Sequence, residues 1–261
     1  MGEIPDSHPR RASLLARQSL VDAAAEGLLA DSAMIAHGRG EAFDYLLGEA
    51  TSESAMSAIR ETSARLLSAE RPAISVNGNT VVLAGEDLIR VAAVVGCPIE
   101  VNLYYRTPER VSGLLGRLSE QREGVAAGAA PQGWSGDWRK AVESVALLGE
   151  AADHRISGLE GPRAVCCWDG IGCADVVLVP LEDGDRCEAL VAAGKEVLVI
   201  DLNPLSRTSM TATVTIVDEV SRASSKLLDQ VIAGERESGY WDNAAALNAA
   251  LDIISDASVD A

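Results

Sequence analysis

Three polar segments in the second half of the chain combine carboxylates or amides with an arginine. They are residues 181–186, 201–207 and 218–222. An arginine fork recognises phosphate and carboxylate groups, and carboxylate or amide oxygens can hold a divalent cation or a ribose hydroxyl. We therefore expect these segments to bind and orient anionic ligands.

The first of these segments is the most specific. Residues 181–186 carry three acidic side chains and lie between an apolar run and a predicted helix, where backbone N–H groups and the helix dipole face an anion. Asp183 or Asp185 could hold Mg2+ or a ribose hydroxyl. The plainer alternative is that Asp185 only caps the helix. For residues 201–207 the alternative is a turn with an exposed arginine. For residues 218–222 it is an ordinary strand-to-helix turn.

A second group of candidates lies near the N-terminus, where glycines alternate with charged residues at 36–45. The Gly38-Arg39-Gly40 run lacks the preceding strand and the third glycine of a dinucleotide-binding fingerprint, and Walker A spacing is absent from the chain. His37 stands beside Arg39 and Glu41, which favours a role in a site over a merely exposed or structural histidine. No local motif supports a Ser-His-Asp or Cys-His nucleophile.

Two further arginines are spaced for a shared helix face. Arg10 and Arg17 are seven residues apart, about two helical turns, so both can point to the same side. A solvated arginine is the alternative for each of them.

The second half of the chain must position its polar segments on a parallel sheet. Residues 175–181, 197–202 and 214–217 form nearly continuous apolar runs, which are typical of strands buried on both faces. A helix is predicted at 185–193, where Asp185 and Glu188 have capping-box spacing. Alternating strands and helices build a doubly wound sheet, and ligands bind outside the carboxyl ends of its strands.

The first half begins with helices and then changes period. Helices are predicted at 12–29 and 52–69, short strands at 73–76 and 81–83, a helix ending at Gly96, and a strand at 99–105. Thr107 and Pro108 then open another helix. We expect residues 121–137 to form a loop and a short helix to lie around 138–149.

The predicted fold is α/β: a Rossmann-like, doubly wound, mostly parallel sheet with helical additions at both ends. We expect a single domain over residues 1–261, with a helical N-terminal segment at 1–70, the core at 73–234 and a helical tail at 235–261.

Composition excludes several classes of protein. The formal net charge of −17, with three lysines against nineteen arginines, argues against nucleic-acid binding and suggests solvation in a salty cytoplasm. The chain has neither a run of about 20 apolar residues nor an apolar leader, so a cytoplasmic protein is expected. The five cysteines include no CxxC pair, which favours reduced core residues over a metal or redox site.

Seven blocks of the chain, in order, resemble the archaeal 4-phosphopantoate–β-alanine ligase family, also called phosphopantothenate synthetase. They are SHPR (7–10), IAHGRGEAFDY (35–45), SVNGN (75–79), EVNLYYRT (100–107), VPLEDGDR (179–186), IDLNPLSR (200–207) and TIVD (215–218). Residues 121–150, which look expanded, and the C-terminal tail depart from the family pattern.

The resemblance implies a homodimer of Rossmann-like chains in coenzyme A biosynthesis. It implies that ATP and Mg2+ activate 4-phosphopantoate as an acyl-adenylate with release of pyrophosphate, and that the amine of β-alanine then displaces AMP. Arginines and Mg2+ would offset the repulsion between the two anionic substrates.

The resemblance also assigns residues to ligands. It places ATP on Arg17, Arg39, Asp183, Gly184, Asp185, Arg186, Asp201, Leu202 and Asn203. Our own assignment gives the phosphate of 4-phosphopantoate to Arg10, Arg106 or Arg207. His37 and Asn77 would orient the reacting groups, and Glu41 would hold Mg2+ or receive the proton of the amine.

Two rival functions make different demands on the sequence. A Rossmann-type oxidoreductase requires a Gly-x-Gly-x-x-Gly turn after its first strand, which Asn77-Gly78-Asn79 does not supply. A non-catalytic ATP sensor would bind ATP without releasing pyrophosphate.

Overall fold

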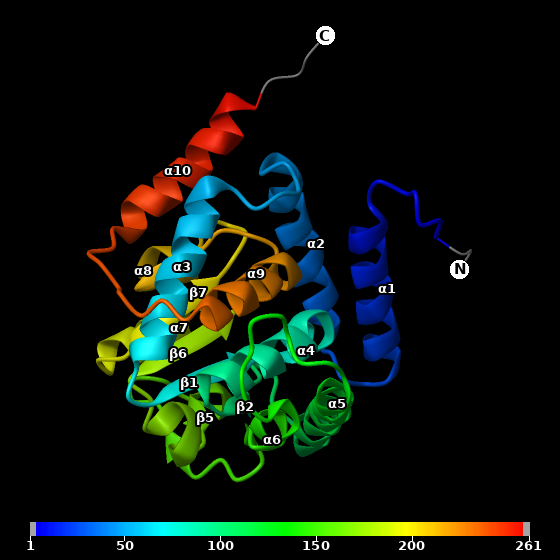
Figure 1. Ribbon diagram of the computed structural model, residues 1–261, viewed down its shortest axis with the longest axis vertical. Helices are drawn as coiled ribbons and strands as arrows, with labels where there is room; N and C mark the ends of the chain where they lie inside the picture. The colour runs from blue at the N-terminus through cyan, green and yellow to red at the C-terminus, as the bar shows by residue number, and fades with distance from the viewer. Residues whose placement is uncertain (1–3, 258–261) are drawn as a thin grey trace.

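The computed structural model describes residues 4–257 and centres on a six-stranded parallel sheet (Figure 1). The strand order is β3-β2-β1-β6-β7-β8. The strands are β1 (Pro72–Val76), β2 (Ile99–Val101), β3 (Leu147–Leu148), β6 (Val176–Pro180), β7 (Glu196–Ile200) and β8 (Val214–Ile216). The order reverses between β1 and β6, and this reversal opens a crevice at the carboxyl ends of those two strands. The doubly wound α/β fold expected from the sequence is confirmed.

Helices cover both faces of this sheet, and three of them come before its first strand in the chain. They are α1 (Arg11–Ala25), α2 (Asp31–Leu46), α3 (Glu53–Ser68), α4 (Gly78–Val95), α5 (Pro108–Ala127), α6 (Trp138–Glu143), α7 (Gly184–Ala192), α8 (Arg207–Thr211), α9 (Val220–Ala233) and α10 (Asn243–Asp256). A small antiparallel pair joins β4 (His154–Arg155) to β5 (Val165–Cys166), followed by a π-helical turn at Trp168–Gly172.

The alternation of side chains along the strands separates two cores. On β6, Leu178 packs into the larger core with α3, α4, α5 and α9, whereas Val177 and Val179 pack into a second core with α7 and the π-helical turn. Successive residues of a strand point to opposite faces, so a strand covered on both sides must be apolar throughout. This is why the apolar runs predicted β6, β7 and β8 well.

Side-chain caps start the helices that border the crevice. The Asn77 side chain accepts from the Thr80 amide at 3.1 Å at the start of α4, and Asp183 accepts from the Arg186 amide at 3.0 Å at the start of α7. Thr107 caps α5, as the sequence predicted. The predicted capping-box role of Asp185 is wrong, because the helix begins at Gly184 and Asp183 takes the cap.

Three other local predictions need correction, and one short helix was missed. Residues 81–83 belong to α4 rather than to a strand, because a short apolar run suits either a strand or the buried face of a helix. Helix α5 continues to Ala127, into the expected loop. Strand β2 ends at Val101, before the 105 expected. The short helix α8 was not predicted.

The burial of the cysteines and the search for a membrane-spanning helix bear on two expectations from composition. Cys97, Cys166, Cys167 and Cys187 are buried, and burial raises the pKa of the Cys97 and Cys187 thiols to about 12. Among residues 4–257 there is no helix with the length and apolar character needed to cross a membrane.

Candidate active site

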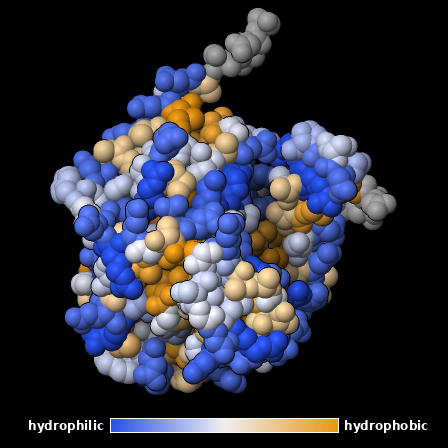
Figure 2. Space-filling view, viewed as in Figure 1, coloured by the Kyte–Doolittle hydropathy of each residue, from blue (hydrophilic) through white to orange (hydrophobic). Residues whose placement is uncertain are grey.

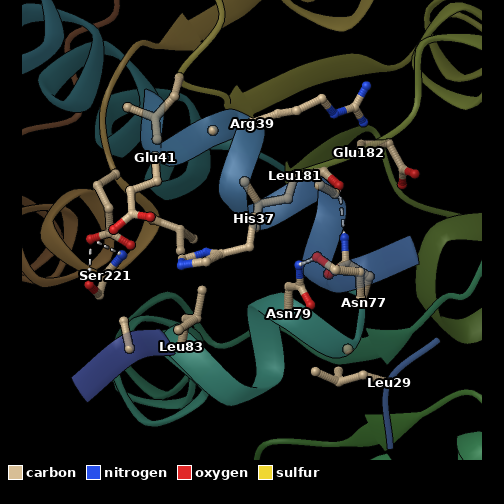
Figure 3. Close-up of a pocket in the computed structure, with 18 of the residues that line it drawn as sticks. Leu29, His37, Arg39, Glu41, Asn77, Asn79, Leu83, Leu181, Glu182 and Ser221 are labelled. Carbon is tan, nitrogen blue, oxygen red and sulfur yellow. Dashed lines mark hydrogen bonds between the residues drawn. The ribbon is translucent and has the colours of Figure 1, made fainter. Parts of the chain in front are cut away.

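A cavity of about 580 Å³ lies at the carboxyl ends of the central strands, where the strand order reverses. Helix α2, the start of α4 and the loop after β6 all contribute side chains to its lining (Figure 3). Eight of the candidate residues line this cavity: Arg10, His37, Arg39, Glu41, Asn77, Asp183, Arg186 and Leu202. The N-terminal helices and the tips of the strands therefore meet at one site.

Asn77 ties the two central strands together at the crevice. Its Oδ1 caps α4, and its Nδ2 donates to the Leu181 carbonyl oxygen at 2.8 Å, as Figure 3 shows. Leu181 has a positive φ of 56°, a conformation that costs free energy for a residue with a branched side chain. The Asn77 amide thus holds the loop after β6 in a strained shape that faces the cavity.

His37 and Arg39 reach the cavity from α2. Burial lowers the pKa of His37, against the opposing influence of Glu41 and Glu219, so the imidazole stays neutral at neutral pH. Its Nε2 is buried and has no hydrogen-bond partner in the part of the chain that the structure describes. Arg39 is exposed, and in Figure 3 its side chain extends along the same side of the cavity as Glu182.

Glu41 gathers the two N-terminal arginines. Arg17 Nη2 lies 2.7 Å from Glu41 Oε2, Arg10 Nη2 lies 3.2 Å from Oε1, and the Ser13 hydroxyl donates to the same carboxylate. Burial alone would raise the pKa of Glu41, but the hydrogen bonds from Arg17 and Ser13 hold it below its usual value. Glu41 is thus better suited to position two arginines than to accept a proton.

A buried arginine ends the segment 181–186 after β6, which we call the nucleotide-type loop. Arg186 is 2% exposed, and its Nη1 donates to the Arg163 carbonyl oxygen at 2.8 Å. Its Nε lies 3.3 Å from Glu182 Oε2, within ion-pair distance but not aligned as a hydrogen bond, and its Nη2 has no partner within residues 4–257. Burial raises the pKa of Glu182, although Arg186 opposes that rise. The guanidinium retains donors for an anion.

The other candidates lie outside the cavity lining. These are Arg17, Arg106, Gly184, Asp185, Asp201, Asn203 and Arg207. Arg207 forms ion pairs with Asp185 and with Glu188, and the Arg106 guanidinium donates to the Gly149 carbonyl.

The polar groups of residues 201–207 mainly fold their own turn. Asp201 accepts from the Asn203 amide at 2.9 Å and from the Ser206 hydroxyl at 2.5 Å. At Gly184, an added Cβ would lie 2.9 Å from the Arg207 Cβ, so the close packing of these two loops requires glycine there.

Two arginines that line the cavity were missed from the sequence, Arg110 and Arg163, and a third, Arg222, belongs to a segment that was singled out without a role for this residue. Arg163 comes from the irregular segment before β5 and pairs with Asp183 at 3.4 Å and with Asp185 at 2.5 Å. No periodicity or motif marks that segment. Arg222 stands in residues 218–222, a segment that also suits an ordinary turn.

The site combines several cations with few free carboxylates, which suits the binding of anions. The acids that line the cavity are already engaged: Glu41 with Arg17, Asp44 with Arg222, Glu49 with Arg10, Glu182 with Arg186, Asp183 with Arg163 and Glu219 with backbone N–H groups of α9. Within the described residues no group of three or more potential metal ligands is found.

Comparison with known proteins identifies the family of the chain. Residues 54–256 match the family model described as phosphopantothenate/pantothenate synthetase. The chain is 46% identical over 220 residues to a 4-phosphopantoate–β-alanine ligase of Methanospirillum hungatei, covering 84% of this chain and 81% of that protein. It is 47% identical over 223 residues to the ligase of Methanosarcina mazei, covering 85% and 79%. It is 44% identical over 229 residues to that of Thermococcus onnurineus, covering 88% and 80%.

Proposed function

Because this chain belongs to the phosphopantothenate/pantothenate synthetase family, we propose that it joins 4-phosphopantoate to β-alanine with the cleavage of ATP to AMP and pyrophosphate. The observation that supports this proposal best is that α2 and the loop after β6 line the same cavity. It places arginines beside a helix N-terminus that suits a nucleotide, which is the arrangement that two anionic substrates require.

The reaction has two steps. A carboxylate oxygen of 4-phosphopantoate attacks the α-phosphorus of ATP, and the bond from that phosphorus to pyrophosphate breaks. The amine nitrogen of β-alanine then attacks the acyl carbon, the bond from that carbon to the AMP oxygen breaks, and the nitrogen loses a proton. Neither step needs an enzyme nucleophile, so positioning and charge stabilisation supply the acceleration.

We assign the residues by their place around the cavity. Arg39, Arg186 and the loop at Asp183 are proposed to bind the nucleotide, with Arg17 contributing through the Glu41 cluster. Of the three arginines expected to bind the phosphate of 4-phosphopantoate, Arg10 lines the cavity, and we favour it over Arg106 and Arg207.

We propose His37 as the group that receives the amine proton. A neutral imidazole with an unpartnered nitrogen can accept a proton, whereas Glu41 is held ionised by its arginines and is a weak base. Asn77 keeps its expected role in orienting the reacting groups, through the strained loop at Leu181.

Mg2+ is proposed to arrive with the nucleotide. This ion is commonly held by substrate phosphates, waters and one or two carboxylates, so the lack of a preformed group of acids in the described residues fits that mode. When bound, Mg2+ would neutralise part of the phosphate charge during adenylation. Asp183 and Glu219 line the cavity and are the acids that could contact it.

We also propose a homodimer. Large apolar side chains are exposed on the two N-terminal helices, with Val21 on α1 at 49% and Ile35 on α2 at 67%. Light scattering should then give a mass of about twice the 27.3 kDa of one chain.

The test is a substrate-omission assay with purified protein, ATP and Mg2+ in buffers of moderate and high salt. AMP and pyrophosphate should accumulate only when 4-phosphopantoate and β-alanine are both present. ATP binding without pyrophosphate release under any combination would identify a sensor instead. Turnover of a nicotinamide cofactor would identify an oxidoreductase.

A further inference from the structure

Two asparagine side chains that line the cavity have fixed amide orientations. Asn79, in the first turn of α4, donates from Nδ2 to the Ala33 carbonyl oxygen at 3.0 Å. Asn102, directly after β2, donates from Nδ2 to Glu100 Oε1 at 3.0 Å. A carbonyl and a carboxylate can only accept, so in both residues the nitrogen must face its partner and Oδ1 must face away from it.

Both amide oxygens are buried, and neither is paired within the described part of the chain. Asn79 is 8% exposed and Asn102 is 5% exposed, and neither Oδ1 has a hydrogen-bond donor among residues 4–257. A buried acceptor without a donor costs free energy, and such groups in folded proteins call for an explanation. A ligand that brings N–H groups into the cavity would remove this cost.

Glu100 holds Asn102 in this orientation. It is 1% exposed, and its carboxylate accepts from the Cys167 amide at 2.9 Å and the Ile171 amide at 2.8 Å, besides Asn102. Because two backbone N–H groups anchor the carboxylate, it cannot turn away from the asparagine. Glu100 is therefore a positioning residue for Asn102.

Asn102 lies on the β2 side of the site, and Asn79 lies in the first turn of α4, after β1. The backbone N–H of Asn102 donates to the Val76 carbonyl oxygen at 2.8 Å, which places Asn102 beside the end of β1. Asn79 follows the end of β1 by three residues. The nucleotide-type loop follows β6, on the other side of β1. An amine held by these asparagines would thus approach from the side opposite the nucleotide.

We propose that Asn79 and Asn102 bind the reacting amine of β-alanine, an inference that rests on the proposed ligase function. A neutral primary amine has two N–H bonds and one lone pair. Two acceptors can hold both hydrogens and leave the lone pair free to form the new C–N bond, while the acyl C–O bond to AMP breaks. The nitrogen's surplus proton then leaves to His37 or water.

The neutrality of the two acceptors fits this role. A carboxylate beside the amine would raise its pKa and keep it as an ammonium ion, which has no lone pair to donate. An amide oxygen accepts a hydrogen bond without this penalty. Glu100 itself is shielded from the cavity by its bonds to Asn102 and the backbone.

Adenylation and amine transfer can be measured separately, so a failure of the amine subsite can be distinguished from a failure of the proposed ligase function. Exchange of labelled pyrophosphate into ATP, dependent on 4-phosphopantoate, reports adenylation without β-alanine. In Asn79→Ala and Asn102→Ala this exchange should stay within roughly twofold of the unmodified protein, while the KM for β-alanine rises roughly tenfold or more, as loss of a buried hydrogen bond commonly costs. Glu100→Gln should raise the same KM with exchange retained.

Thr62→Val is the matched control. It removes a hydroxyl oxygen that is also buried and without a partner among the described residues, but that lies on α3, outside the cavity lining. It should leave both half-reactions unchanged. If Asn102→Ala does not fold by circular dichroism, Asn102→Ser takes its place.

Two results would overturn the amine subsite: an unaltered KM for β-alanine in both asparagine variants, or an exchange rate that falls as much as ligation. Failure of the unmodified protein to catalyse exchange would instead remove the ligase function itself.

Discussion

Arg39 differs from the other arginines that line the cavity. Arg10, Arg163, Arg186 and Arg222 each have a carboxylate within ion-pair distance, and Arg110 donates to the Leu28 and Tyr105 carbonyl oxygens. No ion pair or hydrogen bond of the Arg39 side chain is found within residues 4–257. A cation without a protein partner at the mouth of an anion site is available to the ligand.

Arg39→Ala should therefore lower the rate of ligation by roughly two to four decades, as removal of one positioned donor at a developing charge commonly does. Steady-state rates of AMP formation measure this. Arg139→Ala is the matched control, because its side chain is 64% exposed and its ion pair to Glu143 spans 3.8 Å. Equal rates in the two variants would remove Arg39 from the site.

The histidine at residue 37 makes the amine step depend on pH. Burial lowers the pKa of His37 below its usual 6.5, so the imidazole remains an available base to a lower pH than an ordinary histidine would. As pH falls through that lowered pKa, His37 binds a proton and ligation should slow. His37→Gln should reduce the ligation rate by roughly 10²–10⁴ and abolish this acid limb.

Pyrophosphate exchange is the internal control for that profile, because adenylation requires no deprotonation of an amine. An acid limb that persists unchanged in His37→Gln, or that appears equally in exchange, would assign the titration to another group.

At the scale of elements, one ionic cluster joins α2 to α9 and to the segment that follows β8. Arg222, on α9, lies 2.5 Å from Asp44 on α2 and 2.6 Å from Asp218 after β8, and Asp218 also accepts from the Thr51 hydroxyl. Burial alone would lower the pKa of Arg222, but its bonds to the two carboxylates raise it. Since α2 carries His37 and Arg39, this cluster positions two candidate residues.

Asp44→Asn should lower the free energy of unfolding by about 1.5–3 kcal/mol, the contribution typical of a hydrogen bond to a charged group. Urea titration measures it, and a double-mutant cycle with Arg222→Gln isolates the pair. The control Asp229→Asn changes an exposed acid of α9, the same helix, and should have little effect. Additive losses in the cycle would show that the two residues are not coupled.

At the scale of the whole molecule, the surface carries a large excess of negative charge. The formal net charge is −17, and the face in Figure 2 is hydrophilic over most of its area, with apolar side chains gathered in small patches. Mutual repulsion of like charges opposes compaction, and salt shortens its range from about 10 Å at 0.1 M to about 3 Å at 1 M.

The melting temperature should therefore rise between 0.1 M and 1 M KCl. NaCl at equal ionic strength should have a similar effect if screening is the cause. A melting temperature that stays level or falls with both salts would show that charge repulsion does not limit stability.

Much of the architecture followed from local pattern. The runs at β6, β7 and β8 must be apolar because both faces are covered, and Thr107-Pro108 marks the start of α5 through the chemistry of its own backbone. Residues 81–83 were misassigned because three apolar residues fit either a strand or the buried side of a helix. Whether such a run becomes α4 depends on the cap at Asn77 and on packing against α5 and α9.

The sequence by itself determined β1, β6, β7 and β8, most of the longer helices, and the family that the arginine-, glycine- and acid-bearing blocks resemble. Only the tertiary structure decided which polar groups meet: Asn77 reaches Leu181, 104 residues away, and Asn102 faces the cavity because Glu100 is anchored by backbone that follows 67 residues later. Local periodicity reports which face of an element is buried. It carries no information about the partner across a crevice, because that contact depends on the closure of loops whose length and irregular shape leave no periodic trace.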